Sequence, residues 1–224
     1  MSTFLKNLIK RNFFVFQFIH YLRTKYRIFK SLHGGGNTIV FKGYGKIIKD
    51  VIGTHNTVII NNNTYLNKTT IRIRGNNNKI VFGEGCSVGP KCSFWLEGNN
   101  LEIIIGDKTS FTHTVHFCAQ EENVSIIVGE DCMFSNTITV RTSDSHPIYS
   151  EYGERINNPQ SVYIGMHVWI APGSKIMKGA KIFDGSIIGS NSFVTKEIPE
   201  NSLAVGSPAK VVKNNISWTR ERIF

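Results

Sequence analysis

Residues 164–193 read IGMHVW-IAPGSK-IMKGAK-IFDGSI-IGSNSF, which is one six-residue pattern written five times. Each unit opens with Ile, Val194 opens a sixth unit, and the fifth position is always small or β-branched. A period of six fits neither an α-helix, with about 3.6 residues per turn, nor a simple strand, with a period of about two. Internal repeats of this kind indicate a solenoid. We therefore predict an all-β chain wound as a parallel β-helix, in which three hexads form one triangular coil and the aliphatic residues point inward.

The same pattern continues upstream in a less regular form. Gly83, Gly106 and Gly129 are spaced by 23 residues, and an Asn-containing stretch precedes each of them. Asn and Gly tolerate the left-handed backbone of tight corners, and Asn side chains can stack from coil to coil. We expect each of these coils to be an 18-residue turn with five residues inserted at a corner. The β-helix is predicted over residues 34–200, and a C-terminal tail, residues 201–224, is expected to pack back along it.

Residues 1–33 are predicted to form a basic, amphipathic α-helical extension. Of the net charge of +10, residues 1–30 account for +7, because they hold seven Lys or Arg and no acid, which leaves +3 for the rest. The basic charge is therefore local, and no nucleic-acid partner is expected. The apolar block Phe13–Leu22 is too short to span a bilayer, which needs roughly 20 residues. Residues 3–30 are compatible with peripheral membrane contact, with a cap on the β-helix, or with packing on a neighbouring subunit.

The cysteines and the N-terminus indicate the compartment. Four cysteines lack the spacing of metal sites, and Cys86, Cys92 and Cys132 fall at the small fifth position of a hexad. Buried free thiols in a reducing compartment are therefore expected. No A-x-A-like cleavage site follows the apolar N-terminal stretch. We expect a cytoplasmic protein, associated with the inner face of the cytoplasmic membrane if residues 3–30 bind lipid.

The repeat is interrupted by a polar insertion at residues 141–161. Loops held by a rigid scaffold often carry function. His146 is the leading catalytic candidate, because an imidazole titrates near neutrality and can remove a proton from an attacking hydroxyl group. Pro147 restricts the backbone beside it, and Asp144 could hold the imidazole in one tautomer. A single His in a polar loop is also compatible with a solvated surface residue.

A combination of motifs resembles the hexapeptide-repeat, left-handed β-helix acyltransferases. It consists of the hexads, the loop Asp144–Tyr149, the stretch Gly165–Trp169 and the segment Ala204–Lys210. Three further stretches are most similar to the bacterial polysialic-acid capsule O-acetyltransferases: His146–Tyr149, Gly153–Asn157 and Ile216–Trp218. The resemblance implies transfer of an acetyl group from acetyl-CoA to a saccharide hydroxyl, without a metal. It also implies a homotrimer with active sites between neighbouring β-helices.

The resemblance implies roles for individual residues. His146 corresponds to the catalytic base of the family, and Trp169 to an active-site tryptophan whose N–H could donate to the thioester carbonyl or the oxyanion. No Cys or Ser is arranged for activation by His146, so direct transfer without an acyl-enzyme is expected. The cofactor positions of the wider family correspond to Pro172, Ser190, Thr195, Lys196, Lys210 and Lys213. The lysines suit the CoA phosphates, although each alone is equally typical of a solvated surface.

The acceptor side departs from the family pattern. Many relatives that acetylate small sugars hold the acceptor with an Asn in the preceding coil, where this chain has Thr112–Phe117 without Asn. Secondary candidates for acceptor binding are Trp95, His113, His116, Tyr149 and Arg155.

Three alternatives to O-acetyl transfer remain open. An N-acetyltransferase acting on an amino sugar in surface-glycan synthesis would use the same base. A zinc enzyme similar to the γ-class carbonic anhydrases would need a three-histidine set, for which His113, His116 and His146 are the candidates. A non-enzymatic binding module would use flat, repetitive faces and would have no need of the polar loop.

Overall fold

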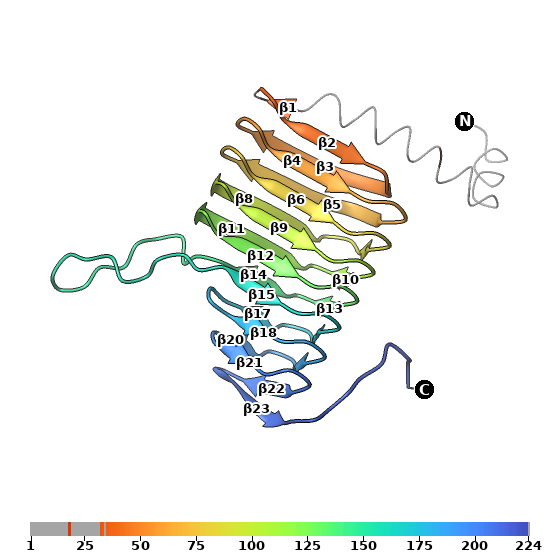
Figure 1. Cartoon of the computed structure of the whole chain (residues 1–224), viewed down its shortest axis with the longest axis vertical. Helices are drawn as coiled ribbons and strands as arrows, with labels where there is room; N and C mark the ends of the chain where they lie inside the picture. Colours follow the sequence, from red (N-terminus) through yellow and green to blue (C-terminus); the bar gives the residue numbers. More distant parts are fainter. Residues whose placement is uncertain (1–17, 19–31, 34, 224) are drawn as a thin grey trace.

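The computed structural model describes residues 18, 32–33 and 35–223, and it confirms the expected parallel β-helix (Figure 1). The first face of the β-helix contains β7 (Ser87–Val88), β10 (Ser110–His113), β13 (Met133–Asn136), β16 (Trp169–Ile170), β19 (Ile187–Ile188) and β22 (Leu203–Gly206). The second face contains β8 (Ser93–Asn99), β11 (His116–Glu122), β14 (Thr139–Arg141), β17 (Lys175–Ile176) and β20 (Phe193–Val194). The third face contains β2 (Thr38–Phe41), β4 (Thr57–Ile60), β6 (Lys79–Phe82), β9 (Glu102–Ile105), β12 (Ser125–Val128), β15 (Val162–Ile164), β18 (Lys181–Ile182) and β21 (Glu197–Ile198).

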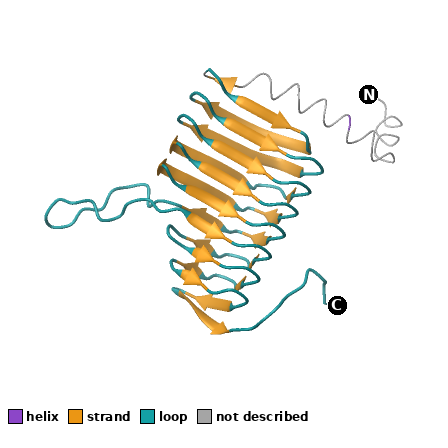
Figure 2. Cartoon of the chain, in the orientation of Figure 1, coloured by secondary structure: helices purple, strands orange, loops and turns teal. Residues whose placement is uncertain are grey.

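The ends of the stack differ from its middle. The long strands β3 (Tyr44–Ile52) and β5 (Tyr65–Arg74) build the first coils, and β5 joins the first and second faces because it pairs with both β7 and β8. β23 (Ala209–Lys213) closes the other end antiparallel to β22, so the β-helix continues beyond residue 200 (Figure 2). The predicted helical extension lies outside the described residues, except for Phe18 and for β1 (Leu32–His33), which pairs with β3. The structure describes no helix long and apolar enough to cross a membrane.

The hexads produce the predicted inward-facing ladder. Ile164 pairs with Ile182 on the third face, and Ile170 pairs with Ile188 on the first. These pairs are 18 residues apart, which is one coil of three hexads. The first and fifth positions of the hexads are both buried, including Val168, Ser174, Ala180, Ser186 and Ser192. Small residues are needed at the fifth position because the chain turns a corner there against the core.

The 23-residue coils keep the predicted period, but the expected corner insertion is wrong. Phe94 on β8 pairs with Phe117 on β11, so the register is 23 residues as predicted. The added residues extend strands: β8 has 7 residues where β17 has 2, and β9 has 4 where β18 has 2. The coils are therefore wider in this half of the stack. Five Phe rings fill the extra space with centroids 4.7–5.7 Å apart: Phe82, Phe94, Phe111, Phe117 and Phe134.

Asparagine ladders hold the corners of the wide coils together, as predicted. The Asn56 amide oxygen accepts from the Asn78 N–H at 3.0 Å, and the Asn78 oxygen accepts from the Leu101 N–H at 2.9 Å. On the outside of this corner, Asn100 and Asn123 have φ of 56° and 57°, in the left-handed region that Asn tolerates.

All four cysteines are free and buried, as predicted. Burial raises the pKa of the thiols, to about 11 for Cys86 and about 12 for Cys132. Since the thiolate is the reactive form, the folded protein should not react with an aromatic disulfide reagent at pH 8. We expect four thiols to appear only after unfolding in denaturant. Rapid modification of any of them in the native protein would contradict this packing.

Candidate active site

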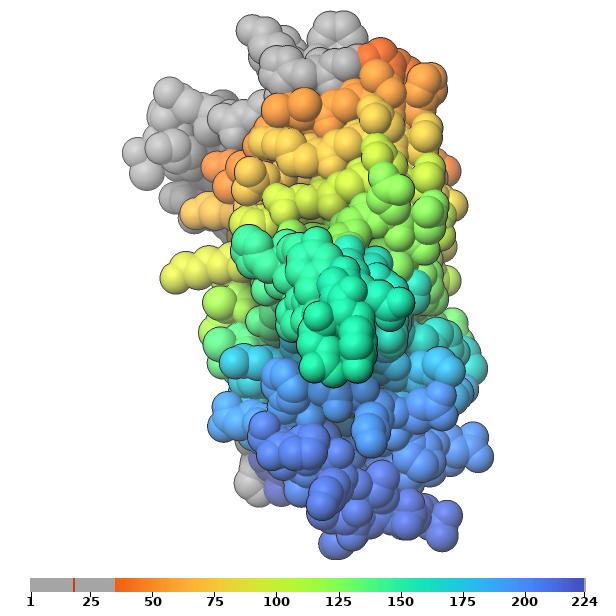
Figure 3. All heavy atoms as spheres, turned by 90° about the vertical axis from the view of Figure 1, so that its left-hand side faces the viewer, coloured from red at the N-terminus to blue at the C-terminus, as the bar shows by residue number. Residues whose placement is uncertain are grey.

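The loop at residues 141–161 leaves the second face after β14 and returns to the third face at β15. It projects sideways from the stack in Figure 1 and stands in front of the middle coils in Figure 3. Its two arms meet at an antiparallel bridge between Tyr149 and Arg155, and the Ile156 N–H donates to the Ile148 carbonyl at 2.9 Å. The loop is therefore a paired arm with His146 near its base.

Asn157 fixes the backbone on both sides of His146. Its amide group is buried, donates to the His146 carbonyl at 2.8 Å and accepts from the Ile148 N–H at 2.7 Å. The same amide donates to the Asp144 carboxylate at 2.9 Å, which also accepts from Lys178 Nζ at 2.5 Å. The His146 side chain itself is exposed. The loop thus presents an imidazole on a fixed backbone, which suits a group that must meet a substrate.

Asp144 faces away from the role considered for it. Its carboxylate is occupied by Lys178 and Asn157, and no hydrogen bond joins it to the His146 ring among the described residues. Its role in holding the tautomer stays a prediction, and in this structure it anchors the loop. Lys178 lies 34 residues further along the chain and was not among the predicted site residues.

A second anchor ties the outer arm to the β-helix. Arg155 Nη1 lies 2.6 Å from Glu121 Oε2 on β11, and the Ser143 hydroxyl donates to the same carboxylate at 2.5 Å. The hydrogen bond from Arg155 lowers the pKa of Glu121, and that from Lys178 lowers the pKa of Asp144, although partial burial opposes both shifts. Arg155, a predicted acceptor-binding residue, is therefore engaged in holding the loop.

These shifts predict that acid releases the loop. A carboxyl group whose folded pKa is depressed stabilises the structure above its unfolded pKa, and that contribution disappears as the pH falls through the folded pKa. Amide hydrogen exchange in residues 141–157 should therefore accelerate on acidification below about pH 4, after correction for the intrinsic rate. Glu121→Gln and Asp144→Asn should show faster exchange already at neutral pH, and Glu151→Gln should not. Exchange in the loop that is independent of pH would contradict this role.

Trp169 lies on the first face, on β16. Its indole N–H donates to the Ser135 hydroxyl at a long 3.4 Å, and its ring is half-buried. The loop carrying His146 leaves from the corner between the second and third faces, across the β-helix from the first face. The structure therefore does not bring His146 and Trp169 together within one chain.

The predicted cofactor residues occupy three places. Pro172 and Ser190 lie at the corner between the first and second faces, in adjacent coils, where the Asn191 N–H donates to the Pro172 carbonyl at 2.8 Å. Thr195 and Lys196 lie at the corner between the second and third faces, one coil beyond Lys178. Lys210 and Lys213 lie on β23, exposed at the end of the stack.

A polar and aromatic column runs along the outside of the second face toward the loop. Arg72, Trp95, Cys118 and Arg141 are in register on β5, β8, β11 and β14. The Arg72 guanidinium lies 4.9 Å from the centre of the Trp95 ring, and His116 meets that ring edge-on at 4.7 Å. Burial and the nearby Arg141 charge lower the pKa of His116.

The column ends at the loop. Arg141 Nη2 donates to the Gln120 amide oxygen at 2.8 Å and to the Ser145 hydroxyl at 2.5 Å, next to His146. Three buried N–H donors of the column have no partner among the described residues: Arg72 Nε, Trp95 Nε1 and Arg141 Nε. Guanidinium and indole donors beside an aromatic face suit a saccharide with acidic groups. Arg72 and Arg141 were not predicted, although their 23-residue spacing from Trp95 and Cys118 carries the signal.

The remaining predicted residues lie apart from one another. His113 is exposed at the end of β10 and contacts Thr114, and Tyr149 is exposed on the projecting loop. His113, His116 and His146 thus lie on three separate elements. Within residues 35–223, no group of three or more His, Cys, Asp or Glu side chains is placed to hold a metal ion.

Comparison with known proteins decides the family. Residues 161–196 match the family described as bacterial transferase hexapeptide (six repeats). The chain is 34% identical over 180 residues to the polysialic acid O-acetyltransferase of Neisseria meningitidis, a match that covers 76% of this chain and 79% of that protein. The chain belongs to the hexapeptide-repeat acetyltransferases. The resemblance found in the motifs of the sequence is thereby confirmed.

Two solved structures of this family share most of the fold. The polysialic acid O-acetyltransferase OatWY has a TM-score of 0.77 at 32% identity, with 86% of this chain and 93% of that chain covered. The polySia-specific acetyltransferase NeuO has a TM-score of 0.75 at 30% identity, with 84% and 87% covered. Other relatives match over a shorter segment. The match to the polysialic acid O-acetyltransferase of Escherichia coli O1:K1 spans 27% of that protein, at 36% identity over 84 residues.

Proposed function

We propose that this acetyltransferase transfers the acetyl group of acetyl-CoA to a hydroxyl group of a bacterial cell-surface polysaccharide, of a capsule or a lipopolysaccharide. The observation that carries the proposal is the 34% identity over most of the chain to an enzyme named for O-acetylation of polysialic acid. We place the reaction in the cytoplasm, where acetyl-CoA is available, with residues 3–30 as a candidate membrane contact.

The active site is shared between copies of the chain in this proposal. His146 and Trp169 lie on opposite sides of one β-helix, so they can act together only if they come from neighbouring copies. The projecting loop exposes four large apolar side chains: Ile148, Tyr149, Tyr152 and Ile156. A contact with a neighbouring copy would cover them. A closed homotrimer gives every copy the same two neighbours and hence three equivalent sites.

The chemistry is a direct transfer in a ternary complex. The His146 imidazole takes the proton of the acceptor hydroxyl as its oxygen attacks the thioester carbonyl carbon. The Trp169 N–H, held only by a long bond to Ser135, donates to the oxyanion that forms. Collapse of the tetrahedral intermediate breaks the C–S bond, and the CoA thiolate takes the proton back from His146. The raised pKa values of the buried thiols favour this route over a cysteine acyl-enzyme.

The second-face column is the proposed path of the acceptor. It leads along Arg72, Trp95 and Arg141 to the base of the loop, so a chain lying on it would bring a hydroxyl group toward His146. Pro172, Ser190 and Thr195 are proposed to line the pantetheine arm, while Lys196, Lys210 and Lys213 are proposed to meet the CoA phosphates.

One assay tests the function. The protein is incubated with acetyl-CoA labelled in the acetyl group and a panel of acidic and neutral capsule and lipopolysaccharide oligosaccharides, and the products are treated with alkaline hydroxylamine. Hydroxylamine releases label from esters and leaves amides intact. We expect label on an acidic saccharide that is fully released. Retained label would indicate an N-acetyltransferase, and absence of label from every saccharide would contradict the proposal.

A further inference from the structure

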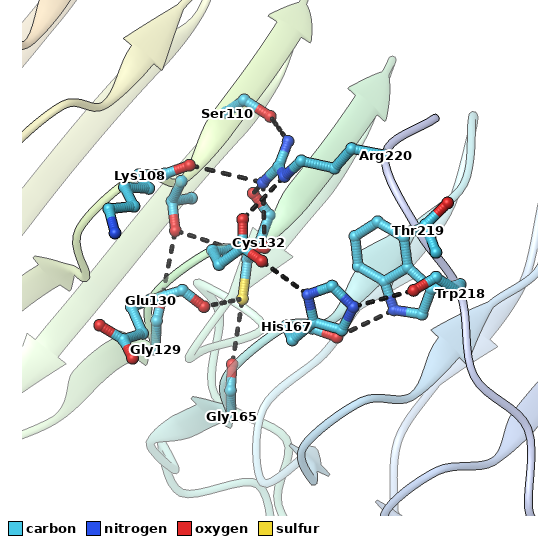
Figure 4. Close-up of polar contacts among 12 residues, drawn as sticks. Lys108, Ser110, Gly129, Glu130, Cys132, Gly165, His167, Trp218, Thr219 and Arg220 are labelled. Atoms are coloured by element: carbon cyan, nitrogen blue, oxygen red, sulfur yellow. Dashed lines mark hydrogen bonds and ion pairs between the residues drawn. The ribbon is translucent and has the colours of Figure 1, made fainter. Parts of the chain in front are cut away.

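The segment beyond β23 returns along the outside of the stack and docks a single large side chain on it (Figures 1 and 4). Trp218 is 8% exposed although it lies near the end of an extended tail. Its indole N–H donates to the His167 carbonyl at 2.9 Å. Its ring stacks on the His167 imidazole with centroids 4.1 Å apart and an interplanar angle of 10°. The tail is therefore attached by a specific contact.

The docked tail is tied down by a network that crosses two coils. His167 Nδ1 lies 2.7 Å from an Asp131 carboxylate oxygen, and His167 Nε2 lies 3.1 Å from the Trp218 carbonyl oxygen. Arg220 donates to the other Asp131 carboxylate oxygen at 2.7 Å and to the Cys132 carbonyl at 2.9 Å. It also donates to the Ser110 hydroxyl at 2.9 Å, as Figure 4 shows. We call Trp218 and Arg220 with their partners His167 and Asp131 the C-terminal clamp.

The clamp ends at Trp169. The Trp218 and Trp169 rings lie 5.9 Å apart at 46°, so one face of the clamp is the candidate catalytic indole. His167 precedes Trp169 by two residues and has φ of 51°, a left-handed conformation that turns the chain into β16. The clamp thus fixes Trp169 by ring contact and through the corner before it. A tail that only closed the end of the β-helix would not need to reach this coil.

We propose that Trp218 is a positioning residue for acetyl transfer, which holds the Trp169 indole in the orientation that meets the oxyanion. The inference rests on the proposed function of Trp169. Misplacement of a catalytic group by about 1 Å can lower a rate by about 100-fold, so ring contacts of this kind are large enough to control turnover.

Kinetics separate positioning from folding. Trp218→Ala should lower kcat by about 10- to 100-fold, with the KM for acetyl-CoA within about threefold of the wild-type value, because orientation is lost and binding is kept. Trp218→Phe keeps a ring against Trp169 and should restore most of kcat. Glu221→Gln, a change of an exposed tail residue outside the clamp, is the matched control. A folded Trp218→Ala enzyme with kcat within about twofold of wild type would overturn the proposal.

A spectroscopic measurement tests the ring contact without activity. The chain has three Trp, so Trp95→Phe leaves only Trp169 and Trp218. Two indoles this close should give an exciton couplet in the far-ultraviolet circular dichroism, which Trp218→Phe abolishes and Arg220→Ala weakens. Absence of the couplet from the Trp95→Phe protein would overturn the clamp. A couplet in a protein whose wild type transfers no acetyl group would instead leave the clamp standing and remove the proposed function.

Discussion

Replacing His146 by Ala is expected to lower kcat by about 10²- to 10⁴-fold, the usual contribution of a general base. Binding of acetyl-CoA, measured by calorimetry, should stay within about threefold of wild type, because the imidazole acts on the acceptor hydroxyl. The side chain is exposed and its backbone is held by Asn157, so the substitution should leave the loop intact. Initial rates with the preferred saccharide give the measurement.

The control for this variant is His55→Ala, which removes an exposed His in an N-terminal coil. Its kcat should equal that of the wild type. If the His146→Ala protein turned over within about tenfold of wild type, another group would have to be the base. The route by direct transfer has its own test in mass spectrometry of the protein during turnover, where an acetylated residue that forms and decays at the rate of the reaction would contradict it.

Replacing Trp169 by Phe is expected to lower kcat by about 100-fold, as found when one donor to an oxyanion is removed. Phe keeps the ring packing against Trp218 and loses only the N–H, so melting temperature and the KM for acetyl-CoA should change little. Trp95→Phe is the comparison, because Trp95 belongs to the proposed acceptor path. It should raise the KM for the saccharide and leave kcat nearly unchanged. A Trp169→Phe enzyme with wild-type kcat would show that the oxyanion has a different donor.

The fold could be predicted because each hexad position has one geometric fate. The opening Ile of a unit points into the core, and the fifth residue turns a corner, so six letters determine three contacts. The wide coils were harder to predict, because an insertion of five residues has the same length whether it forms a loop or extends a strand. Only the pairing of Leu96 with Ala119 and of Glu97 with Gln120 shows that it extends strands.

The candidate site was predicted where a motif is continuous in sequence and missed where contacts join distant segments. His146 stands inside a local motif and could be found. Lys178, which holds Asp144, and Arg220, which holds Asp131, are 34 and 89 residues away from their partners. The insertion at 141–161 breaks the period between these segments, so counting repeats does not align them. The Arg72–Arg141 column could have been found, because its members keep the 23-residue spacing of the wide coils.

A mixing experiment tests the central claim, which is acetyl transfer at a site shared between copies. His146→Ala and Trp169→Phe proteins, each nearly inactive, are unfolded together in equal amounts, refolded, and assayed for O-acetylation of the preferred saccharide. If each site takes His146 from one copy and Trp169 from its neighbour, random assembly restores both residues in about a quarter of the sites, and activity should rise to about that fraction of a refolded wild-type control. Activity that stays at the level of the two parents, while the control refolds normally, would contradict the account.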